Sequence, residues 1–415
     1  MKKQIQTTFK SLRHRNFRLF FLGQVVSLTG TWVQNIAQSW LVYRMTDSPL
    51  LLGLSGFMGQ IPVFLFGLLG GVVADRYNRH RIILITQTLS MIQAFLLSGL
   101  VLSGEIQVWE IFALAFLLGS VSSFDLPARQ SYFIEMVGKE DLPNAIALNS
   151  SAVNGARLMG PVIAGLLVGL AGEGVCFLIN GLSFLAVIGG LLLMRTSPFE
   201  PKKMTISIFE YLKEGILYGV KTPLINRTLL LLSLLSLVGL PYSVLMPIFS
   251  KTIFKGGPDT YGFLMGGAGL GALLGTLTLA RIGSKDFEKT IFMVAVGTGV
   301  SFIAFSFSKI ILISFFILIV TGFCMMSQLA ATNTLLQTVV PDRLRGRLMS
   351  FYGFVLLGFT PFGSLLEGFF AEKIGAPLTV FISGTLIIGG AFLYFRKGVL
   401  RPVFKASLTI PPENP

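Results

Sequence analysis

The sequence predicts an all-α membrane protein with twelve transmembrane helices in two pseudo-symmetric six-helix bundles. Of its 415 residues, 53% are hydrophobic and 13% are charged, whereas a soluble protein of this size carries about 25% charged residues. Apolar runs recur along the chain, each long enough to cross a hydrocarbon core of about 30 Å as a helix. Internal similarity between the two halves of the chain predicts the pairing into bundles.

Six apolar runs precede a polar break and six follow it. The runs are 19–43, 50–73, 82–102, 109–124, 145–170 and 175–194, then 229–254, 261–280, 290–307, 310–335, 348–370 and 378–395. They divide the chain into a basic cytoplasmic arm (1–18), an N-terminal bundle (19–194), a cytoplasmic linker (195–225), a C-terminal bundle (226–396) and a cytoplasmic tail (397–415). Apolar residues at helical spacing predict an amphipathic surface helix within the linker, at 206–220.

The two halves resemble each other in sequence. Pro161 and Pro361 each lie in the fifth run of their half, and the segment 177–183 resembles 380–386. A parallel repeat of this kind predicts that the two halves fold into similar bundles.

The net charge of +14 is explained by the topology of the chain in the membrane. On the predicted topology most of the 33 lysines and arginines lie on the side of the two termini, and such an excess marks the cytoplasmic side. We therefore expect both termini in the cytoplasm. The basic surface would contact anionic lipid headgroups rather than nucleic acid.

The sequence offers little metal or cofactor chemistry. Its two histidines, His14 and His80, lie in basic surface stretches, and its two cysteines lie within apolar runs. Neither a His-based metal centre nor a disulfide framework is expected. We expect no cofactor, and a monomer.

A short charged turn separates the second and third runs. Its notable residues are Gly71, Asp75, Arg76, Arg79 and Arg81. Because an acid and several arginines cannot lie within lipid, the turn must lie at a membrane surface. The pattern resembles the cytoplasmic signature loop of the major facilitator superfamily of transporters, with Asn78 where the family usually has glycine.

This resemblance implies a cytoplasmic gate. In the family, the acid equivalent to Asp75 lies beside the N-terminus of the eleventh helix, whose positive dipole end favours it. The equivalent of Arg79 pairs with an acid at the cytoplasmic end of the fourth helix, and the sequence offers Asp125 there. These charges would lock the halves together when the cytoplasmic side is closed. The alternative is an arginine cluster that only sets topology.

The fifth run carries small residues that resemble the Gly-Pro motif of superfamily antiporters. They are Gly155, Gly160, Pro161 and Gly165, and the eighth run offers a matching face of Gly262, Gly266, Gly267, Gly271 and Gly275. Small residues let helix backbones approach closely, so a tight pivot is expected between these runs. Ordinary small-residue packing is the alternative.

Arg157 lies deep within the fifth run, on one helical face with Asn154 and Pro161. An arginine there costs at least about 2.5–3.5 kcal/mol on insertion scales, so it should face water or a partner. We expect it to contact an anionic group of the substrate or to control a nearby acid. A structural arginine that bonds helix-end carbonyls is the alternative.

Polar residues line one face of the first run. They are Gln24, Ser27, Thr31, Asn35 and Gln38. In the superfamily, helices one, four, seven and ten line the cavity, and this resemblance places the stripe there. It also nominates Tyr242, Gln328, Thr332 and Asn333 in the second half. Interhelical hydrogen bonding without substrate contact is the alternative.

Two carboxylates remain as candidates for proton coupling, Asp125 and Glu367. The first is already assigned to the gate, and the second lies near the outer end of the eleventh run, where an ordinary interfacial carboxylate is the favoured interpretation. The basic residue typical of the fourth span in many drug antiporters is missing.

Three stretches indicate one branch of this family. Residues 127–130, 141–145 and 344–350 together resemble the branch that includes bacterial enterobactin exporters and macrolide efflux proteins. That resemblance implies export of an amphipathic small molecule, of the drug or siderophore class, by proton antiport and alternating access. A lipid or lysophospholipid flippase and a transport-inactive sensor or scaffold remain alternatives. A membrane enzyme is not expected, because no nucleophile with a base and no phosphate-cradling loop is present.

Overall fold

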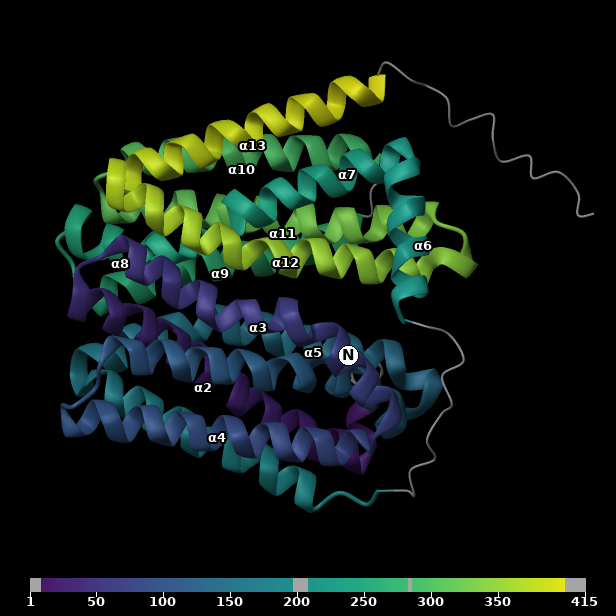
Figure 1. The fold of residues 1–415 in the computed structure, drawn as a ribbon, viewed down its shortest axis with the longest axis horizontal. Coiled ribbons are helices and arrows are strands. Elements are labelled where there is room, and N and C mark those ends of the chain that lie inside the picture. Colours follow the sequence, from purple (N-terminus) through teal and green to yellow (C-terminus); the bar gives the residue numbers. More distant parts are fainter. Residues whose placement is uncertain (1–8, 197–207, 283–285, 400–415) are drawn as a thin grey trace, which may run out of the picture.

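The computed structural model describes residues 9–196, 208–282 and 286–399, and within these ranges the regular structure is helical (Figure 1). The first half comprises η1 (Lys10–Arg13), α2 (Arg15–Thr46), α3 (Pro49–Arg76), α4 (Arg79–Ser103) and α5 (Val108–Leu192). The linker helix is α6 (Ile208–Lys221). The second half comprises α7 (Pro223–Leu234), η2 (Leu235–Gly239), η3 (Leu240–Leu245), α8 (Met246–Ile248), η4 (Phe249–Ile253), α9 (Pro258–Ile282), α10 (Phe287–Phe307), α11 (Ile311–Val339), α12 (Asp342–Ile374) and α13 (Ala376–Val399).

The 85-residue α5 is broken twice by glycine. Gly138 and Gly172 have φ angles of 73° and 81°, which residues other than glycine rarely adopt. The breaks leave three segments, 108–137, 139–171 and 173–192, where the sequence predicts its fourth, fifth and sixth spans.

Two of these segments extend beyond the predicted runs. The fourth run was expected to end at residue 124, yet the helix continues through Pro127 to Val137, and the next segment begins at residue 139 rather than 145. Buried Tyr132, Phe133 and Met136 continue the apolar face, and they pack in a core with α2 and α4. Tertiary packing therefore outweighs the helix-breaking tendency of the proline.

The first helix of the second half is irregular. Between residues 223 and 253 it passes through π and 3₁₀ turns, with Pro241 and Pro247 inside it. Proline removes a backbone donor and interrupts the regular bonding of an α-helix, which accounts for the irregular turns.

The two halves form two layers that meet along paired helices (Figure 1). In one seam α3 packs on α12, and in the other the second segment of α5 packs on α9. Gly53 approaches Gly368 in the first seam, and Gly165 approaches Gly262 in the second. A Cβ atom on Gly165 would lie 2.6 Å from the carbonyl oxygen of Pro258, so each crossing depends on glycine.

One end of the molecule is closed by contacts between the halves. The Tyr43 hydroxyl lies 3.0 Å from the Thr252 hydroxyl, and Ser48 donates a hydrogen bond of 3.0 Å to Glu372. Lys251 pairs with Asp47 beside them. At the opposite end, which carries η1 and α6, each ion pair among the described residues lies within one half. The halves are therefore fastened at one end.

Candidate transport cavity

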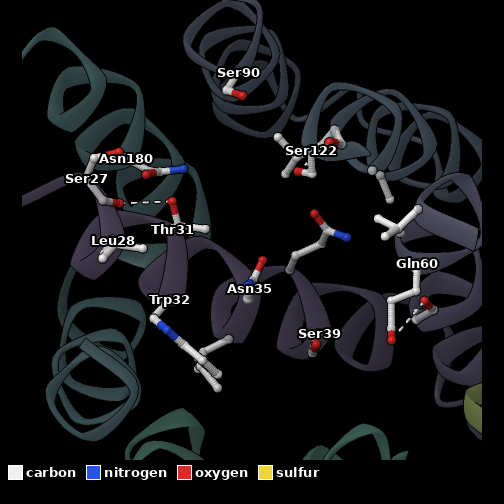
Figure 2. A pocket seen from close by; sticks show the side chains of 18 of the residues that line it. Ser27, Leu28, Thr31, Trp32, Asn35, Ser39, Gln60, Ser90, Ser122 and Asn180 are labelled. Carbon is white, nitrogen blue, oxygen red and sulfur yellow. Dashed lines mark hydrogen bonds between the residues drawn. The ribbon is translucent and has the colours of Figure 1, made fainter. Parts of the chain in front are cut away.

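A cavity of about 540 Å³ is lined mostly by the first half, with a smaller part of its wall from the second half. Along α2 it extends from Gln24 to Ser39, which is about 23 Å at the helical rise of 1.5 Å per residue. Much of its wall consists of amides and hydroxyls, and Figure 2 shows Asn35 of α2 and Ser122 on different sides of the pocket. Such a wall can hold a cargo by hydrogen bonds on several sides.

The polar stripe of the first run forms one wall of this cavity. Gln24, Thr31, Asn35 and Gln38 are all among the residues that line it. Thr31 donates a hydrogen bond of 2.9 Å to the backbone oxygen of Ser27, which leaves the three amides as the groups best suited to bind a cargo. One of them, Gln24, is 2% exposed, and its side-chain oxygen has no partner within the described chain.

The second half contributes less than the sequence predicts. Its lining residues are Ser243, Val244, Tyr261 and Met265. The nominated Tyr242, Gln328, Thr332 and Asn333 are not among the lining residues. Tyr242 instead packs on Phe302, and Asn333 bonds to Gln337 within α11. The irregular helix turns Ser243 and Val244 toward the cavity, which a regular helical spacing could not anticipate.

Asp125 lines the cavity and pairs with Arg129. It also accepts hydrogen bonds from Thr86, at 2.7 Å, and from Gln87, at 3.0 Å. In this structure Asp125 therefore does not form the expected pair with Arg79. The fourth helix continues three turns past Asp125, so this acid lies inside the helix rather than at its end.

The partner of Arg79 is Glu135, at 2.5 Å. Arg79 also lies 3.4 Å from Asp75 and donates to the backbone oxygen of Ala74. Sequence reasoning missed Glu135 because it ended the fourth run too early. The apolar spacing of Tyr132, Phe133 and Met136 was the signal that the helix continues.

The remaining residues of the signature turn surround this pair. Arg76 and Arg81 are exposed, and Gly71 has open space at its Cβ position. Asn78 caps α4 by accepting a hydrogen bond from the Arg81 amide, which fits the turn expected from its place in the pattern.

Arg157 lies where the two halves meet. Its guanidinium lies 5.6 Å from the ring centre of Trp32, and Nη1 lies 3.0 Å from the Met326 sulfur of the opposite half. No carboxylate of the described residues pairs with it. Neighbouring Asn154 is buried and bonds to the backbone of Ser150. Neither Arg157 nor Asn154 is a lining residue of the cavity, whereas Trp32 is.

The glycines of the fifth run differ in their contacts. Pro161 and Gly165 meet Gly262 of α9, as described above. Gly160 packs on Trp32 of α2 instead, and Gly155 has open space at its Cβ position. On α9, Gly266 faces the second segment of α5, whereas Gly267, Gly271 and Gly275 face α11. The α5–α9 seam is thus shorter than the sequence pattern suggests.

Glu367 is buried, at 3% exposed, and accepts a hydrogen bond of 2.6 Å from Ser383. Its second carboxyl oxygen has no partner within the described chain. The interpretation of Glu367 as an interfacial carboxylate is therefore wrong, because α12 continues two turns further, to Ile374.

Relatives of the chain are known among bacterial proteins. Residues 6–411 match the family described as transmembrane secretion effectors. The chain is 26% identical to a staphyloferrin A transporter of Staphylococcus aureus, over 92% of this chain and 96% of that protein. It is 23% identical to macrolide efflux protein A of Streptococcus pyogenes (91% and 95% covered) and 26% identical to an enterobactin exporter of Shigella boydii (91% and 90%).

Solved structures share the fold at lower sequence identity. A bacterial homologue of the human lysosomal transporter Spinster superposes with a TM-score of 0.73 at 14% identity, over 93% of this chain and 97% of that one. The nucleoside transporter NupG superposes with a TM-score of 0.72 at 15% identity, over 92% and 99%. The fold and the family match agree, and the chain belongs to the transmembrane secretion effectors of the major facilitator superfamily, the transporters that its signature turn resembles.

Proposed function

We propose that this protein exports a small amphipathic molecule from the cytoplasm of a bacterium by alternating access. The observation that carries this proposal is the cavity of about 540 Å³, rich in amides and hydroxyls, which both halves line, in a molecule whose halves are joined by polar contacts at one end. The relatives named for staphyloferrin A, macrolides and enterobactin support a cargo of the siderophore or drug class.

The chain crosses the inner membrane twelve times in this proposal. Nine helices of the described residues are long and apolar enough to span, and one of them is the 85-residue α5, which its two glycine breaks divide into three. Helix α2, whose polar stripe lowers its hydropathy, makes the twelfth. Residues 19–194 and 226–396 form the two bundles, with both termini and the basic side in the cytoplasm. The fastened end then faces outward, and the cavity loads from the cytoplasm.

Cargo binds to the wall of the cavity that α2 forms. Gln24, Asn35 and Gln38 supply hydrogen bonds, together with Thr31 at the centre of the stripe. Arg157 lies beside the lining residue Trp32 and receives an anionic group of the cargo when the halves move, because its half-buried guanidinium has a thioether and an aromatic ring as neighbours but no carboxylate within the described chain. The other candidate residues contact the cargo only when the halves move; they are Asn154, Tyr242, Gln328 and Asn333.

The signature turn closes the cytoplasmic side after loading. Arg79, which pairs with Glu135, also holds Asp75 at the end of α3, where Asp75 can meet the N-terminus of α12 when the halves approach. The same turn contains Gly71, Arg76 and Arg81, which lie on the surface of the first half that approaches the second half.

Proton antiport supplies the energy. Asp125 and Glu367 are the candidate carriers, and the geometry favours Glu367. Its carboxyl has one hydrogen bond and no ion pair with a described residue, so a proton can satisfy its free oxygen. Asp125 is instead neutralised by Arg129.

A lipid flippase of the same fold is the second candidate. An apolar groove of about 520 Å³ lies between α2 and α5, lined by residues such as Val26, Val33 and Ile163. A groove of this kind can accept an acyl chain. A transport-inactive sensor is a third reading, which flux measurements would distinguish.

The test is a flux screen in proteoliposomes with an imposed pH gradient. The probes are staphyloferrin A, enterobactin, a macrolide and lysophosphatidylcholine. We expect movement of one of the first three against its gradient, driven by protons. Flux of the lipid alone would favour the flippase, and binding without flux would favour the sensor. Flux that ignores the pH gradient would refute proton coupling.

A further inference from the structure

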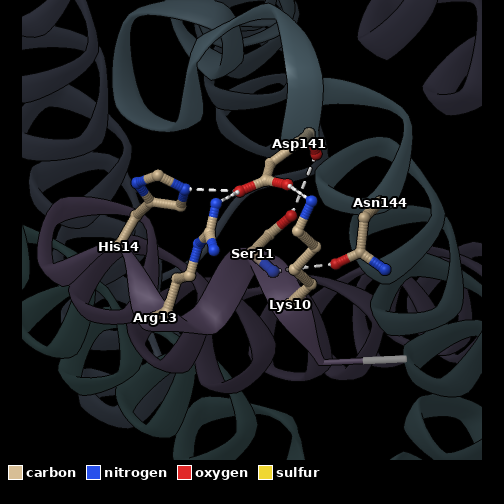
Figure 3. A network of polar contacts seen from close by, with 6 residues as sticks. All are labelled: Lys10, Ser11, Arg13, His14, Asp141 and Asn144. Atoms are coloured by element: carbon tan, nitrogen blue, oxygen red, sulfur yellow. Dashed lines mark hydrogen bonds and ion pairs between the residues drawn. The ribbon is translucent and has the colours of Figure 1, made fainter. Parts of the chain in front are cut away.

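The segment before α2 docks on the start of the second segment of α5 (Figure 3). Asp141, which is 1% exposed, contacts three basic side chains there. Lys10 lies 2.8 Å from Oδ1, while Arg13 and His14 lie 2.8 and 2.7 Å from Oδ2. One buried carboxylate therefore contacts three side chains of the segment 10–14.

Hydrogen bonds fix the same contact through the backbone. The Ser11 amide donates to the side-chain oxygen of Asn144 at 2.9 Å, and the Ser11 hydroxyl donates to the backbone oxygen of Asp141 at 2.9 Å. Ser11 is fully buried. The contact is therefore a shaped docking site and not a loose pairing of surface charges.

The second half contains an equivalent contact with the charges reversed. The linker helix α6 precedes the first helix of that half, and its Glu214 pairs with Arg347 and lies 3.5 Å from Arg343. Both arginines lie in the first turns of α12. Gly215 packs on the backbone of Arg347, where a Cβ atom would come within 2.5 Å of its carbonyl oxygen.

The two contacts occupy corresponding places in the repeat. In each half, the segment that precedes the first helix docks at the start of the fifth, in which Pro161 and Pro361 correspond. Because the halves are similar, each segment could in principle dock on either half. Opposite charges prevent this, since Arg343 and Arg347 would repel the basic η1 and Asp141 would repel Glu214.

We propose that Asp141 and Glu214 are positioning residues that make each half move as one body. The first contact ties α2, which carries the polar stripe, to the α5 segment that carries Gly165 and Arg157. The second ties α7 to α12, which carries Gly368 of the other seam. The first contact therefore links a cavity-wall helix to a seam helix, and the second links a seam helix to the helix that leads into Ser243 and Val244 of the cavity wall. The reversed charges prevent each segment from docking on the wrong half.

The test compares Asp141→Asn with Glu140→Gln, an exposed neighbouring carboxylate, in the full-length protein. Hydrogen exchange of the amides of residues 9–14 is the first readout. We expect exchange at least tenfold faster in Asp141→Asn and unchanged in Glu140→Gln. Efflux of staphyloferrin A from proteoliposomes is the second, and we expect a maximal rate lowered several-fold with KM within twofold, since no cargo contact changes.

A charge swap separates positioning from general damage. Asp141→Arg combined with Lys10→Glu and Arg13→Glu should restore slow exchange and the transport rate, whereas Asp141→Arg alone should not. Wild-type exchange in Asp141→Asn, or a swap that fails to restore it, would overturn the proposal. The exchange measurement decides this even if staphyloferrin A is not the cargo, so failure of the transport proposal remains distinguishable.

Discussion

The α5–α9 seam makes a quantitative prediction about the fastened end. In Gly165→Ala, the new methyl group would lie 2.6 Å from the Pro258 carbonyl oxygen and 3.1 Å from the Gly262 Cα atom. Ordinary contact needs about 3.4 Å, so the two helices must separate by most of an ångström. Overpacking of this kind costs about 1–3 kcal/mol.

A matched control removes the effect of helix propensity. Gly155 lies in the same segment with open space at its Cβ position, so Gly155→Ala adds the same methyl group without a clash. Both changes gain about 1 kcal/mol of helix propensity. The difference between the two variants therefore isolates the seam, and it corresponds to a shift of about 5- to 150-fold toward states in which the end is open.

The assay is hydrogen exchange at the fastened end. The amide of Leu50 donates to Glu372 across the halves, at 3.1 Å, so it reports separation there directly. We expect its exchange to be at least fivefold faster in Gly165→Ala than in Gly155→Ala. Equal rates in the two variants would refute the view that close glycine packing holds this end shut.

Three further predictions follow from individual side chains. Glu367→Gln should abolish flux driven by a pH gradient while cargo exchange between equal pH values continues; loss of both would assign Glu367 to folding instead. Arg157→Gln should weaken staphyloferrin A binding at least tenfold, since a charge-assisted hydrogen bond contributes about 1.5–3 kcal/mol, but should change macrolide binding less than twofold; equal losses, measured by calorimetry, would contradict an anion contact. Hydrogen bonds from Lys10 and then His14, with the charge of Arg13, lower the pKa of Asp141. The extra melting temperature of wild type over Asp141→Asn should therefore shrink as the pH falls below the ordinary aspartate pKa of about 3.9; the same difference at about pH 5 and about pH 3 would contradict this.

Features set by local periodicity could be predicted from the sequence. The stripe from Gln24 to Gln38 follows the helical repeat, and the structure places it on the cavity wall. The seam glycines Gly165 and Gly262 were likewise visible as small residues in apolar runs. Neither required knowledge of distant contacts, because the spacing of residues in a helix fixes which of them share a face.

Features that depend on tertiary packing could not be predicted in the same way. The predicted fourth run ended at residue 124, so the family resemblance placed Asp125 at the end of the helix as the partner of Arg79, and Glu135 was missed. The apolar face beyond Pro127 keeps the helix intact. Likewise, irregular turns around Pro241 decide which side chains of the second half reach the cavity.

The position of the docked segments bears on how the halves can move. Both seams depend on glycine, and in each half the seam helix that carries a docking contact is fixed to the first helix of its own half, at the end away from the fastened one. A seam helix that is fixed in this way moves together with the first helix of its half. A displacement at the seam therefore also displaces that first helix. Weakening either docking contact should slow conversion between states, whereas weakening a seam should change their populations. Comparison of Asp141→Asn with Gly165→Ala in one exchange experiment therefore separates the rate from the equilibrium.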